Sequence, residues 1–406
     1  MKKIIILGAG FGGIAVAKSL LKQNAQAEIT LIDQNSDHII HGNLYEVATS
    51  PEELTRLGEL KRCVAVPLQE IFQDLPINIV QAKVEGVDLA QKIVKTVGHT
   101  FTYDYLVSAL GAGPNYFAIP GAKEFSLTLL SATDALRIRS QIETAIQVHK
   151  SDYKKKVVNI VVAGGGVAGV EVSAELQKMI DFLAWENNYP RLKVITTIIE
   201  RSQTVLSGFP KKVIRVGTQR LQDLGIKLQT NSSITRVEHG QVYTDQAQLP
   251  FDVLIWTAGV SANGLPGPIQ TPVAIGKRIE VNEHFQLDEF RSVYVIGDQC
   301  CRHDSQGNPL PGTASQAIDH ARFVAQSIAL GLKNRKPLSH SCKSYPFVIP
   351  LGGKWAIFSS RNLFLKGRLG YLVRQLVWLR YFVEILGLFS GIHWWLRSNE
   401  LFSRND

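Results

Sequence analysis

The chain is poor in cysteine and lacks long apolar runs. Its 406 residues include four cysteines, Cys63, Cys300, Cys301 and Cys342, with no Cys-x-x-Cys pair and no His and Cys spacing typical of a zinc site. We therefore expect no metal centre and a reducing compartment. No stretch of about 18 uninterrupted apolar residues occurs, so no ordinary transmembrane helix is expected.

Acidic residues are scarce near the end of the chain. Charged residues make up 19% and hydrophobic residues 45% of the sequence, which permits a large core and argues against disorder. Residues 335–406 contain eleven Lys or Arg and three Asp or Glu, so +8 of the net charge of +9 lies in these last 72 residues. A basic tail of this kind indicates an anionic partner, either nucleic acid or a lipid surface.

The chain instead has two copies of one glycine-rich pattern. In the first, GAGFGG, Gly8, Gly10 and Gly13 follow the spacing G-x-G-x-x-G, between an expected strand at 3–7 and an expected helix at 14–23. The first glycine allows a tight turn, the second lets a pyrophosphate approach the backbone, and the third lets helix and strand pack closely. The free N–H groups of the helix N-terminus favour phosphate there.

An acidic residue completes the first pattern. Asp33 ends the next expected strand, 28–33, and lies 20 residues after Gly13. A carboxylate at this position can accept hydrogen bonds from a ribose diol. Strand, turn, helix and acid together predict a dinucleotide-binding βαβ unit.

The second pattern is GGGVAG, with Gly164, Gly166 and Gly169 at the same spacing. Glu200 is its expected ribose acid, although it lies 31 residues after Gly169. A carboxylate there would repel a 2′-phosphate and favours NADH over NADPH, but Arg201 could accept that phosphate. The expected flanking elements are a strand at 157–163, a helix from residue 170 and a strand at 194–200.

The repetition extends beyond the turns. YDYLVSALG (103–111) and FDVLIWTAG (251–259) each combine an aromatic-Asp pair, an apolar strand and a terminal glycine, roughly 90 residues after their own turn. A further strand, RSVYVIGD (291–298), ends in Gly-Asp. This internal symmetry predicts two related nucleotide-binding halves.

The order of these segments resembles the two-dinucleotide-binding-domain flavoproteins, over about residues 2–332. The resemblance implies an α/β fold of two Rossmann-like domains, one for FAD (1–120 and 285–345) and one for NAD(P)H (121–284), followed by an amphipathic helical C-terminal region (346–406). It implies FAD binding by Gly8, Gly10, Gly13, Asp33, Gly297 and Asp298, and NADH binding by Gly164, Gly166, Gly169 and Glu200. The other cofactor-binding residues expected are Phe11, Gly12, Gly111 and Gly259.

Within that superfamily, HIIHGNLYEVATS (38–50) lacks the redox cysteine pair of the disulfide reductases. The adjacent Cys300 and Cys301 are a poor match to the pair of sulfide:quinone oxidoreductases, and we interpret them as small filler residues. LYEVAT (44–49) and Glu171 in GGGVAGVEVSAEL instead resemble type II NADH:quinone oxidoreductases.

GTASQAIDHA (312–321) resembles the quinone-site segment of the same family, usually AQxAxQ. Gln316 matches its first glutamine, and His320 replaces the second. The resemblance thus implies Glu171, Gln316 and His320 as catalytic residues. Each also has a structural interpretation, because an acid in a first helical turn, a capping glutamine and a packed histidine are common.

The C-terminal region contains one strongly hydrophobic segment, Tyr371–Phe389. Its apolar stripe comprises Leu372, Leu376, Leu379, Val383 and Leu386, and its opposite side carries Arg374, Arg380, Tyr381 and Glu384. Beyond Gly391, Trp394 and Trp395 are adjacent. Tryptophan with arginine suits a membrane interface, so we expect a pair of helices lying in the plane of an anionic lipid surface. The alternative is a dimerisation or core-packing stripe, which leaves a homodimer open.

These features lead to one functional hypothesis. We expect a peripheral protein of the cytoplasmic face of the cell membrane that passes two electrons from NADH through FAD to a menaquinone or ubiquinone type of membrane quinone, without proton pumping. Nucleic acid is not expected as a partner, because the basic residues are interleaved with large aliphatic ones. The alternatives are a soluble NAD(P)H-dependent ferredoxin-type flavin reductase and a flavin-binding membrane scaffold or sensor with little turnover.

Overall fold

The chain folds into two compact units, each built from separate stretches. The computed structural model describes residues 1–51, 57–151, 157–186, 193–267, 273–303, 307, 310, 312–336, 338–341 and 345–403. Cys342 lies outside these residues. Unit 1 consists of Met1–His38, Val66–Gly113 and Ser261–Tyr345; unit 2 consists of Ile39–Ala65, Pro114–Val260 and Pro346–Asp406.

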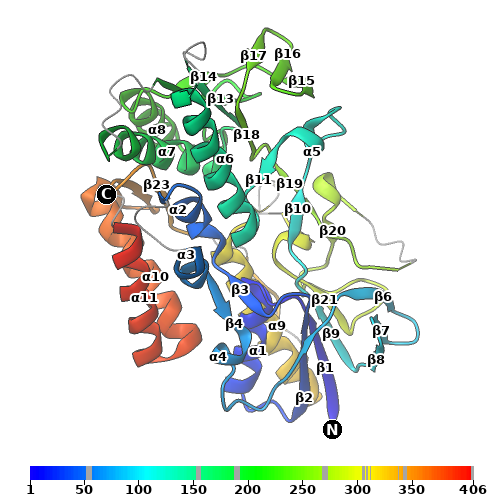
Figure 1. Ribbon diagram of the computed structural model, residues 1–406. Helices are drawn as coiled ribbons and strands as arrows, with labels where there is room; N and C mark the ends of the chain where they lie inside the picture. The colour runs from blue at the N-terminus through cyan, green and yellow to red at the C-terminus, as the bar shows by residue number, and fades with distance from the viewer. Residues whose placement is uncertain are drawn as a thin grey trace. The chain divides into compact units, whose positions relative to one another are not determined.

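The centre of unit 1 is a five-stranded parallel sheet with the order β21-β9-β1-β2-β5. Its strands are β1 (Lys2–Leu7), β2 (Ala27–Asp33), β5 (Asn78–Gln81), β9 (Tyr105–Ser108) and β21 (Val293–Val295). The last four residues of β1 are all buried, as expected when both faces of a parallel sheet are covered. Helices α1 (Phe11–Lys22) and α9 (Ala314–Leu332) pack against each other (Figure 1).

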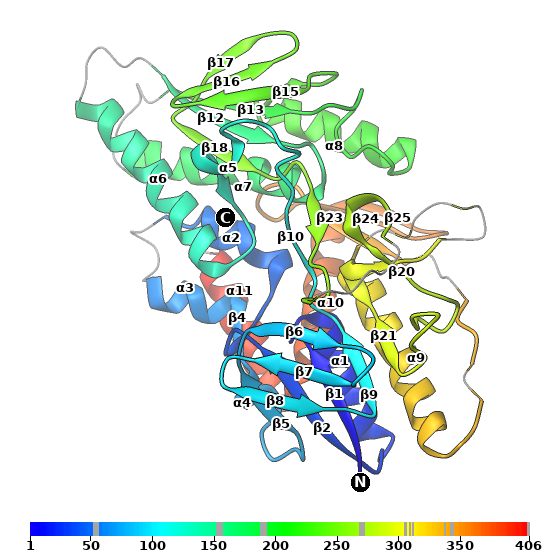
Figure 2. The same cartoon turned by 90° about the vertical axis from the view of Figure 1, so that its right-hand side faces the viewer.

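The rest of unit 1 consists of short elements. A three-stranded antiparallel sheet, visible in Figure 2, contains β6 (Val84–Asp88), β7 (Ile93–Thr96) and β8 (His99–Thr102). The remaining elements are α4 (Leu68–Ile71), the helical turns η2 (Ile275–Lys277) and η3 (Gly297–Gln299), and the strands β20 (Ile279–Glu280) and β22 (Cys300–Cys301).

Unit 2 repeats the central motif of unit 1. Its parallel sheet has the order β11-β18-β12-β13-β14. The strands are β11 (Leu127–Thr128), β12 (Val158–Ala163), β13 (Val194–Ile199), β14 (Lys227–Gln229) and β18 (Val253–Trp256). The accompanying helices are α6 (Ala132–Ser151), α7 (Val167–Glu186) and α8 (Lys211–Asp223). Helix α7 has 20 residues against 12 in α1, which lengthens the connection to the next strand.

Two further sheets and the C-terminal helices complete unit 2. The sheets are antiparallel: β15 (Ile234–Glu238) with β16 (Gln241–Thr244) and β17 (Gln248–Pro250), and β23 (Phe347–Pro350) with β24 (Ala356–Ser359) and β25 (Phe364–Gly367). The helices are η1 (His41–Asn43), α2 (Leu44–Ala48), α3 (Leu57–Val64), α5 (Ala122–Phe125), α10 (Arg368–Leu386) and α11 (Leu388–Ser403). Four short strands lie where the chain passes between units: β3 (Asp37–Ile39), β4 (Ala65–Pro67), β10 (Ala112–Pro114) and β19 (Val260–Ala262).

The predicted fold class, two Rossmann-like domains with a helical C-terminal region, is confirmed by these elements. The two compact units divide the chain differently from the three predicted domains, since 261–284 belongs to unit 1 and 346–406 to unit 2. The assignment of functions to 1–120 with 285–345, 121–284 and 346–406 therefore stays a prediction.

The turn between the two C-terminal helices lies at Gly387, inside the hydrophobic segment Tyr371–Phe389. Gly387 has a φ of +84° and its N–H donates to the Val383 carbonyl, which ends α10. Gly391 instead lies inside α11, where an added Cβ would lie 2.5 Å from the Val383 Cα. This glycine therefore serves the close packing of α10 against α11.

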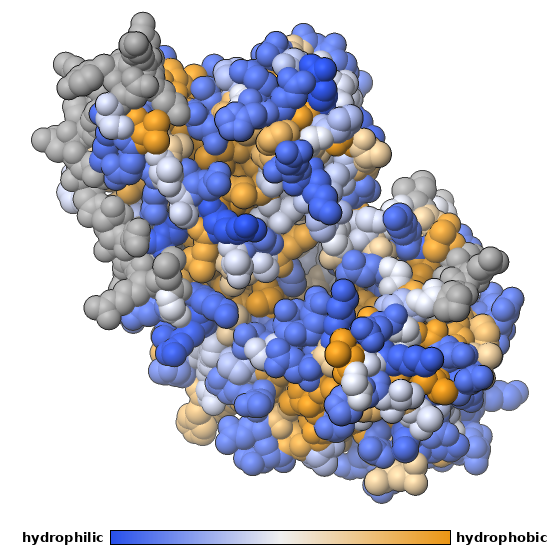
Figure 3. All heavy atoms as spheres, turned by 45° about the vertical axis from the view of Figure 1, so that its right-hand side comes forward, coloured by the Kyte–Doolittle hydropathy of each residue, from blue (hydrophilic) through white to orange (hydrophobic). Residues whose placement is uncertain are grey.

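In the described part of the chain, no helix combines the length and apolar character needed to cross a membrane. The face drawn in Figure 3 mixes hydrophobic and hydrophilic side chains, as is normal for a protein surface. On α10 the exposed side chains are concentrated: Leu369, Leu372, Leu376 and Val377 are each more than half exposed. The stripe predicted from the sequence thus faces outward at Leu372 and Leu376, and the core-packing alternative is wrong for these two residues.

Candidate cofactor sites and buried charge cluster

The first glycine turn, in unit 1, has the shape that a bound pyrophosphate requires. Gly8 has a φ of +94°, and a Cβ there would overlap the Ala109 carbonyl oxygen. A Cβ on Gly13 would overlap the Gly8 carbonyl, so only glycine lets α1 start this close to β1. Around Gly10 there is open space, because a Cβ would meet no heavy atom within 4 Å. Backbone N–H groups can approach a phosphate at that point.

Asp33 and His38 hold the peptide of Ala9 in this turn. The Ala9 N–H donates to Asp33 Oδ2 at 2.6 Å, and the Asn35 N–H donates to Asp33 Oδ1 at 2.8 Å. The Ala9 carbonyl lies 3.0 Å from Nδ1 of His38, which is fully buried, so this nitrogen carries the proton and donates. The ring of Phe11 contacts His38 edge-on at 4.9 Å.

The second glycine turn, in unit 2, repeats this geometry. Gly164 has a φ of +103°, and a Cβ on Gly169 would overlap the Gly164 carbonyl. Gly166 again faces open space. The Gly165 N–H donates to Glu200 Oε2 at 2.7 Å, and the Ser202 N–H donates to Glu200 Oε1 at 2.7 Å.

The carboxylates of Asp33 and Glu200 therefore occupy equivalent positions, despite the longer spacing of Glu200 in the sequence. Each accepts one N–H from the second residue of its turn and one from two residues further along its own segment. The two turns differ in the donor to the carbonyl of their second residue. The Gly165 carbonyl accepts the Leu206 N–H at 2.7 Å, whereas the Ala9 carbonyl accepts from His38 Nδ1. Both turns fit a dinucleotide, and His38 is the contact that the sequence pattern did not reveal.

The other predicted cofactor residues lie beside the two turns. Gly12 packs against Ile296, where a Cβ would lie 3.1 Å from that side chain. Gly111 (φ +67°) lies between β9 and β10, Gly297 (φ +66°) lies shortly after β21, and Asp298 follows Gly297 in η3. In unit 2, Gly259 follows β18, and a Cβ there would lie 3.0 Å from the Phe117 ring.

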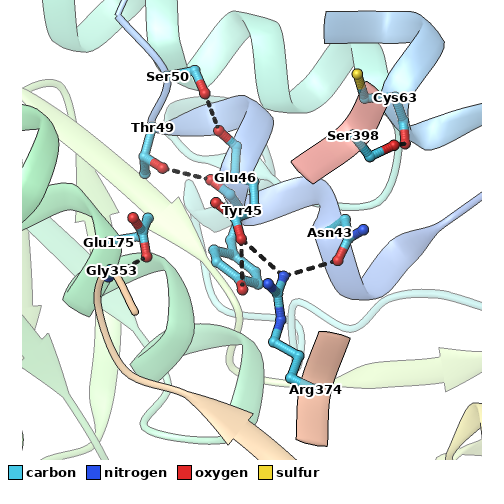
Figure 4. Close-up of polar contacts among 10 residues, drawn as sticks. All are labelled: Asn43, Tyr45, Glu46, Thr49, Ser50, Cys63, Glu175, Gly353, Arg374 and Ser398. Carbon is cyan, nitrogen blue, oxygen red and sulfur yellow. Dashed lines mark hydrogen bonds and ion pairs between the residues drawn. The ribbon is translucent and has the colours of Figure 1, made fainter. Parts of the chain in front are cut away.

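A buried charge cluster lies within unit 2. Arg374 of α10 is 5% exposed and points toward α2 and the preceding turn (Figure 4). Its Nη2 donates to Glu46 Oε1 at 2.8 Å and to Asn43 Oδ1 at 3.0 Å. The Tyr45 hydroxyl donates to the same Glu46 oxygen at 3.1 Å, and the guanidinium lies 5.5 Å from the centre of the Tyr45 ring. The hydrogen bonds and opposite charge offset the desolvation of Glu46 and Arg374.

Glu171, half-buried in the first turns of α7, is influenced by this cluster. Burial raises the pKa of Glu171 from 4.5 to about 8; Arg374 opposes the shift, and Glu46 adds to it. The carboxyl therefore carries a proton at neutral pH. Glu175, one turn further on, is buried and accepts the Gly353 N–H at 3.1 Å, which links α7 to the loop after β23.

Sequence reasoning missed the role of Arg374. It placed Arg374 and Tyr381 on the polar side of the C-terminal helix, but both are buried against unit 2. Trp394, expected at a membrane interface, is also buried and stacks on Phe382, with ring centroids 6.3 Å apart. The lipid-facing interpretation of Trp394 is therefore wrong. Trp395 donates its Nε1 proton to the Gln375 carbonyl at 3.0 Å.

Gln316 and His320 lie one turn apart on α9, in unit 1, and are 5% and 4% exposed. Both line a small pocket shared with Gly297, Cys300, Thr313 and Arg278. Thr313 caps the helix by accepting the Gln316 N–H at 3.3 Å, so the Gln316 side chain is not the cap. Gln316 Oε1 and His320 Nδ1 have no hydrogen-bond partner among the described residues. Two buried polar atoms in one pocket indicate space for a polar ligand atom or water.

The three predicted catalytic residues are thus found in different units. Gln316 and His320 share the pocket of unit 1, and Glu171 lies with Arg374 and Glu46 in unit 2.

The described residues contain no group of three or more His, Cys, Asp or Glu that could hold a metal ion. Cys300 and Cys301 are buried in β22, and burial raises the pKa of the Cys301 thiol, which makes a reactive thiolate unfavourable there.

The arrangement of two dinucleotide turns in one chain matches a known family. Residues 2–321 match the family described as pyridine nucleotide-disulphide oxidoreductase. The chain belongs to this family. The matched region includes both glycine turns, Glu171 and the segment that contains Gln316 and His320.

Relatives within the family confirm the predicted resemblance to type II NADH:quinone oxidoreductases. The Type II NADH:quinone oxidoreductase Ndh of Mycobacterium tuberculosis is 27% identical over 354 residues, 82% of this chain and 74% of that protein. The Demethylphylloquinone reductase NdbB of a Synechocystis strain is 26% identical over 411 residues, 97% of this chain and 96% of that protein.

The fold also matches a solved structure over its whole length. NDH2 from Plasmodium falciparum, in complex with NADH, has a TM-score of 0.84 and 18% sequence identity, and the match covers 99% of each chain. This likeness includes the C-terminal helices, because no more than 1% of either chain lies outside it.

Proposed function

We propose that this protein is a type II NADH:quinone oxidoreductase, which oxidises NADH and reduces a quinone through FAD without proton pumping. The observation that carries the proposal is the pair of equivalent turns, each closed by a carboxylate, in a chain of this family. When bound, FAD supplies the two-electron chemistry between the nicotinamide and the quinone.

The first turn holds FAD, and the second holds NADH. Gly10 and Gly166 leave space for pyrophosphate beside a helix N-terminus. Asp33 and Glu200 each fix their turn, and each oxygen retains a lone pair for a ribose hydroxyl. The charge of Glu200 favours NADH, because a 2′-phosphate would be repelled there.

Glu171 serves as a proton donor in unit 2. Its pKa of about 8 keeps the carboxyl protonated at neutral pH and places it in the range in which a general acid is effective. Arg374 lowers the pKa of Glu171 and Glu46 raises it, so the charge cluster sets how readily this carboxyl releases its proton.

Gln316 and His320, in unit 1, bind the quinone acceptor. Both residues line one pocket, and each has a buried polar atom without a partner among the described residues, which suits hydrogen bonding to a quinone. A naphthoquinone of the menaquinone type is the favoured acceptor, because the relative aligned over nearly the whole chain is a Demethylphylloquinone reductase.

The protein binds the cytoplasmic face of the membrane through α10 and α11. Leu372, Leu376 and Phe389 are 56%, 62% and 86% exposed, and Arg368 and Arg380 are exposed on the same helix as the two leucines. Exposed large apolar side chains beside arginines suit the boundary between anionic headgroups and acyl chains. The apolar face is directed to lipid in this proposal, so no homodimer is needed to cover it.

Anaerobic stopped-flow on the detergent-solubilised protein tests the function. NADH is mixed in first, flavin absorbance is followed, and menadione or a short-chain ubiquinone is then added. We expect fast bleaching by NADH and fast recovery with the quinone, faster with menadione.

Two results would overturn the proposal. Bleaching without recovery on either quinone would indicate a protein acceptor, as in the ferredoxin-type alternative. Bound FAD that NADH fails to bleach would indicate a scaffold or sensor.

A further inference from the structure

Phe285 of unit 1 adopts a backbone conformation that is unfavourable for its type. Its φ is +62°, and its ring is fully buried. Bulky residues rarely occupy this left-handed region, because the Cβ crowds the backbone there. Asn282 fixes the turn, since its Oδ1 accepts the N–H groups of His284 at 2.9 Å and Gln286 at 3.0 Å.

The strained backbone directs the Phe285 ring against His320. The two ring centroids are 4.3 Å apart, a closer approach than Phe285 makes to Phe323 (5.7 Å) or His340 (5.0 Å). Phe285 therefore packs directly against the imidazole of His320 and is not among the residues that line the pocket.

His340 closes the same cluster from a different segment. Its ring lies 5.8 Å from that of His320 and nearly perpendicular to it, at 86°. His340 Nε2 lies 2.6 Å from Asp319 Oδ2, and the His340 N–H donates to the Glu283 carbonyl at 3.3 Å. The ring of His340 is thus held by Asp319 of α9, and its backbone is held by the turn that contains Phe285.

The electrostatic surroundings of His320 come from three elements. Burial lowers the pKa of His320 from 6.5 to about 4; His340 and Arg302 lower it further, and Asp319 opposes them. His320 is therefore a neutral imidazole at physiological pH. One ring nitrogen donates and the other accepts, and Nδ1 has no partner among the described residues.

We propose that His340, paired with Asp319, and Phe285 are positioning residues that hold His320 in the orientation needed to hydrogen-bond the quinone. Neither Phe285 nor His340 lines the pocket that Gln316 and His320 share. Both would act through His320, the histidine that replaces the second glutamine of the segment 312–321, because both pack against its ring. The inference rests on the proposed function.

A double-mutant cycle tests the proposal on the FAD-loaded protein. The variants are His340→Phe, which keeps a ring but loses the pair with Asp319; His320→Gln, which removes the target; and the combination of both. The rate of reoxidation by menadione is measured after anaerobic reduction by NADH. His99→Gln, at an exposed histidine of unit 1, is the matched control and is expected to match the unmodified protein.

The expected result is non-additive. His340→Phe slows reoxidation about tenfold in the unmodified protein but less than twofold in the His320→Gln background, because a positioning residue has nothing left to position. Reduction by NADH changes less than twofold throughout. Equal slowing in both backgrounds, or no slowing in either, would overturn the proposal.

A second measurement does not depend on turnover. Nitrogen NMR of histidine-labelled, FAD-loaded protein reports the protonation state of His320, assigned with His320→Gln. We expect a neutral ring at pH 7 whose titration midpoint moves upward in His340→Phe and downward in Asp319→Asn. An unchanged His320 signal in both variants would contradict the coupling. If menadione fails to reoxidise the unmodified protein after NADH has bleached it, the proposed function fails, and this inference with it.

Discussion

At the residue scale, the buried groups of unit 2 depend on partners that are distant in the sequence. Arg374 reaches Glu46 across 328 positions and Asn43 across 331. Without Arg374, the buried Glu46 carboxylate would lose the positive charge that offsets its desolvation, which is costly. A local pattern could not reveal the pair, because both residues read as ordinary polar positions of amphipathic helices.

The pKa of Glu171 predicts how stability depends on pH. Because the folded-state pKa is raised from 4.5 to about 8, the folded protein binds this proton more tightly than the unfolded chain. The associated stability is fully present below about pH 4.5 and is lost as the pH rises through 8. Glu171→Gln removes this loss. The melting temperature of the variant, relative to that of the unmodified protein, should therefore increase between pH 5 and pH 8.5.

Differential scanning calorimetry at several pH values measures the difference. Glu124→Gln, at an exposed glutamate of unit 2, is the control and should show no such trend. A difference between Glu171→Gln and the unmodified protein that stays constant with pH would show that Glu171 titrates near its ordinary value.

At the scale of elements, α10 presents two faces with opposite roles. The inner face carries Arg374, Tyr381 and Phe382 into unit 2, and the outer face exposes Leu372 and Leu376. The 4-3-4-3 spacing predicted an apolar stripe, but only the folded unit decides that the stripe faces outward and the arginine inward.

Replacing the outer leucines should weaken membrane binding without weakening the fold. Burying one leucine in an apolar phase contributes about 1.5–3 kcal/mol, so Leu372→Gln with Leu376→Gln should lower the affinity for phosphatidylglycerol vesicles at least tenfold. Vesicle flotation measures binding, and the melting temperature should stay within about 2 °C.

Leu75→Gln, at a 38% exposed leucine of unit 1, is the matched control for this loss. Unchanged flotation of the double variant would contradict a lipid-facing role for α10. An equal loss in Leu75→Gln would show that general surface hydrophobicity is being measured.

At the scale of the whole molecule, the chain contains one binding motif twice. Each copy has its own parallel sheet, its own glycine turn and its own carboxylate, in a different unit. Removing the carboxylate of one copy should therefore impair cofactor binding at that copy alone.

Asp33→Ala should reduce the FAD bound per protein after purification. Glu200→Ala should retain FAD and raise the KM for NADH about tenfold, since a hydrogen bond to a charged group contributes about 1.5–3 kcal/mol. Flavin absorbance and steady-state kinetics measure the two effects, and each variant is the control for the other. Equal loss of FAD in both would contradict the assignment of one cofactor to each turn.

Much of the fold could be predicted because its signals are local. Strand β1 and helix α1 were expected at 3–7 and 14–23 and occupy Lys2–Leu7 and Phe11–Lys22. A buried strand, a glycine turn and an amphipathic helix each need only neighbouring residues to specify them. The break at Gly387 lies inside the hydrophobic segment 371–389 and was not predicted, and the role of Gly391, close packing against Val383, is a tertiary contact.

The sequence by itself determined the two glycine turns, the acid of the first turn and the family to which the chain belongs, because these depend on residue type at a characteristic spacing. Only the tertiary structure decided that Glu200 matches Asp33 despite its longer spacing, that His38 completes the first turn, and that Arg374 is buried beside Glu46. These contacts join residues from separate elements, and packing, which no local pattern encodes, brings them within hydrogen-bond distance.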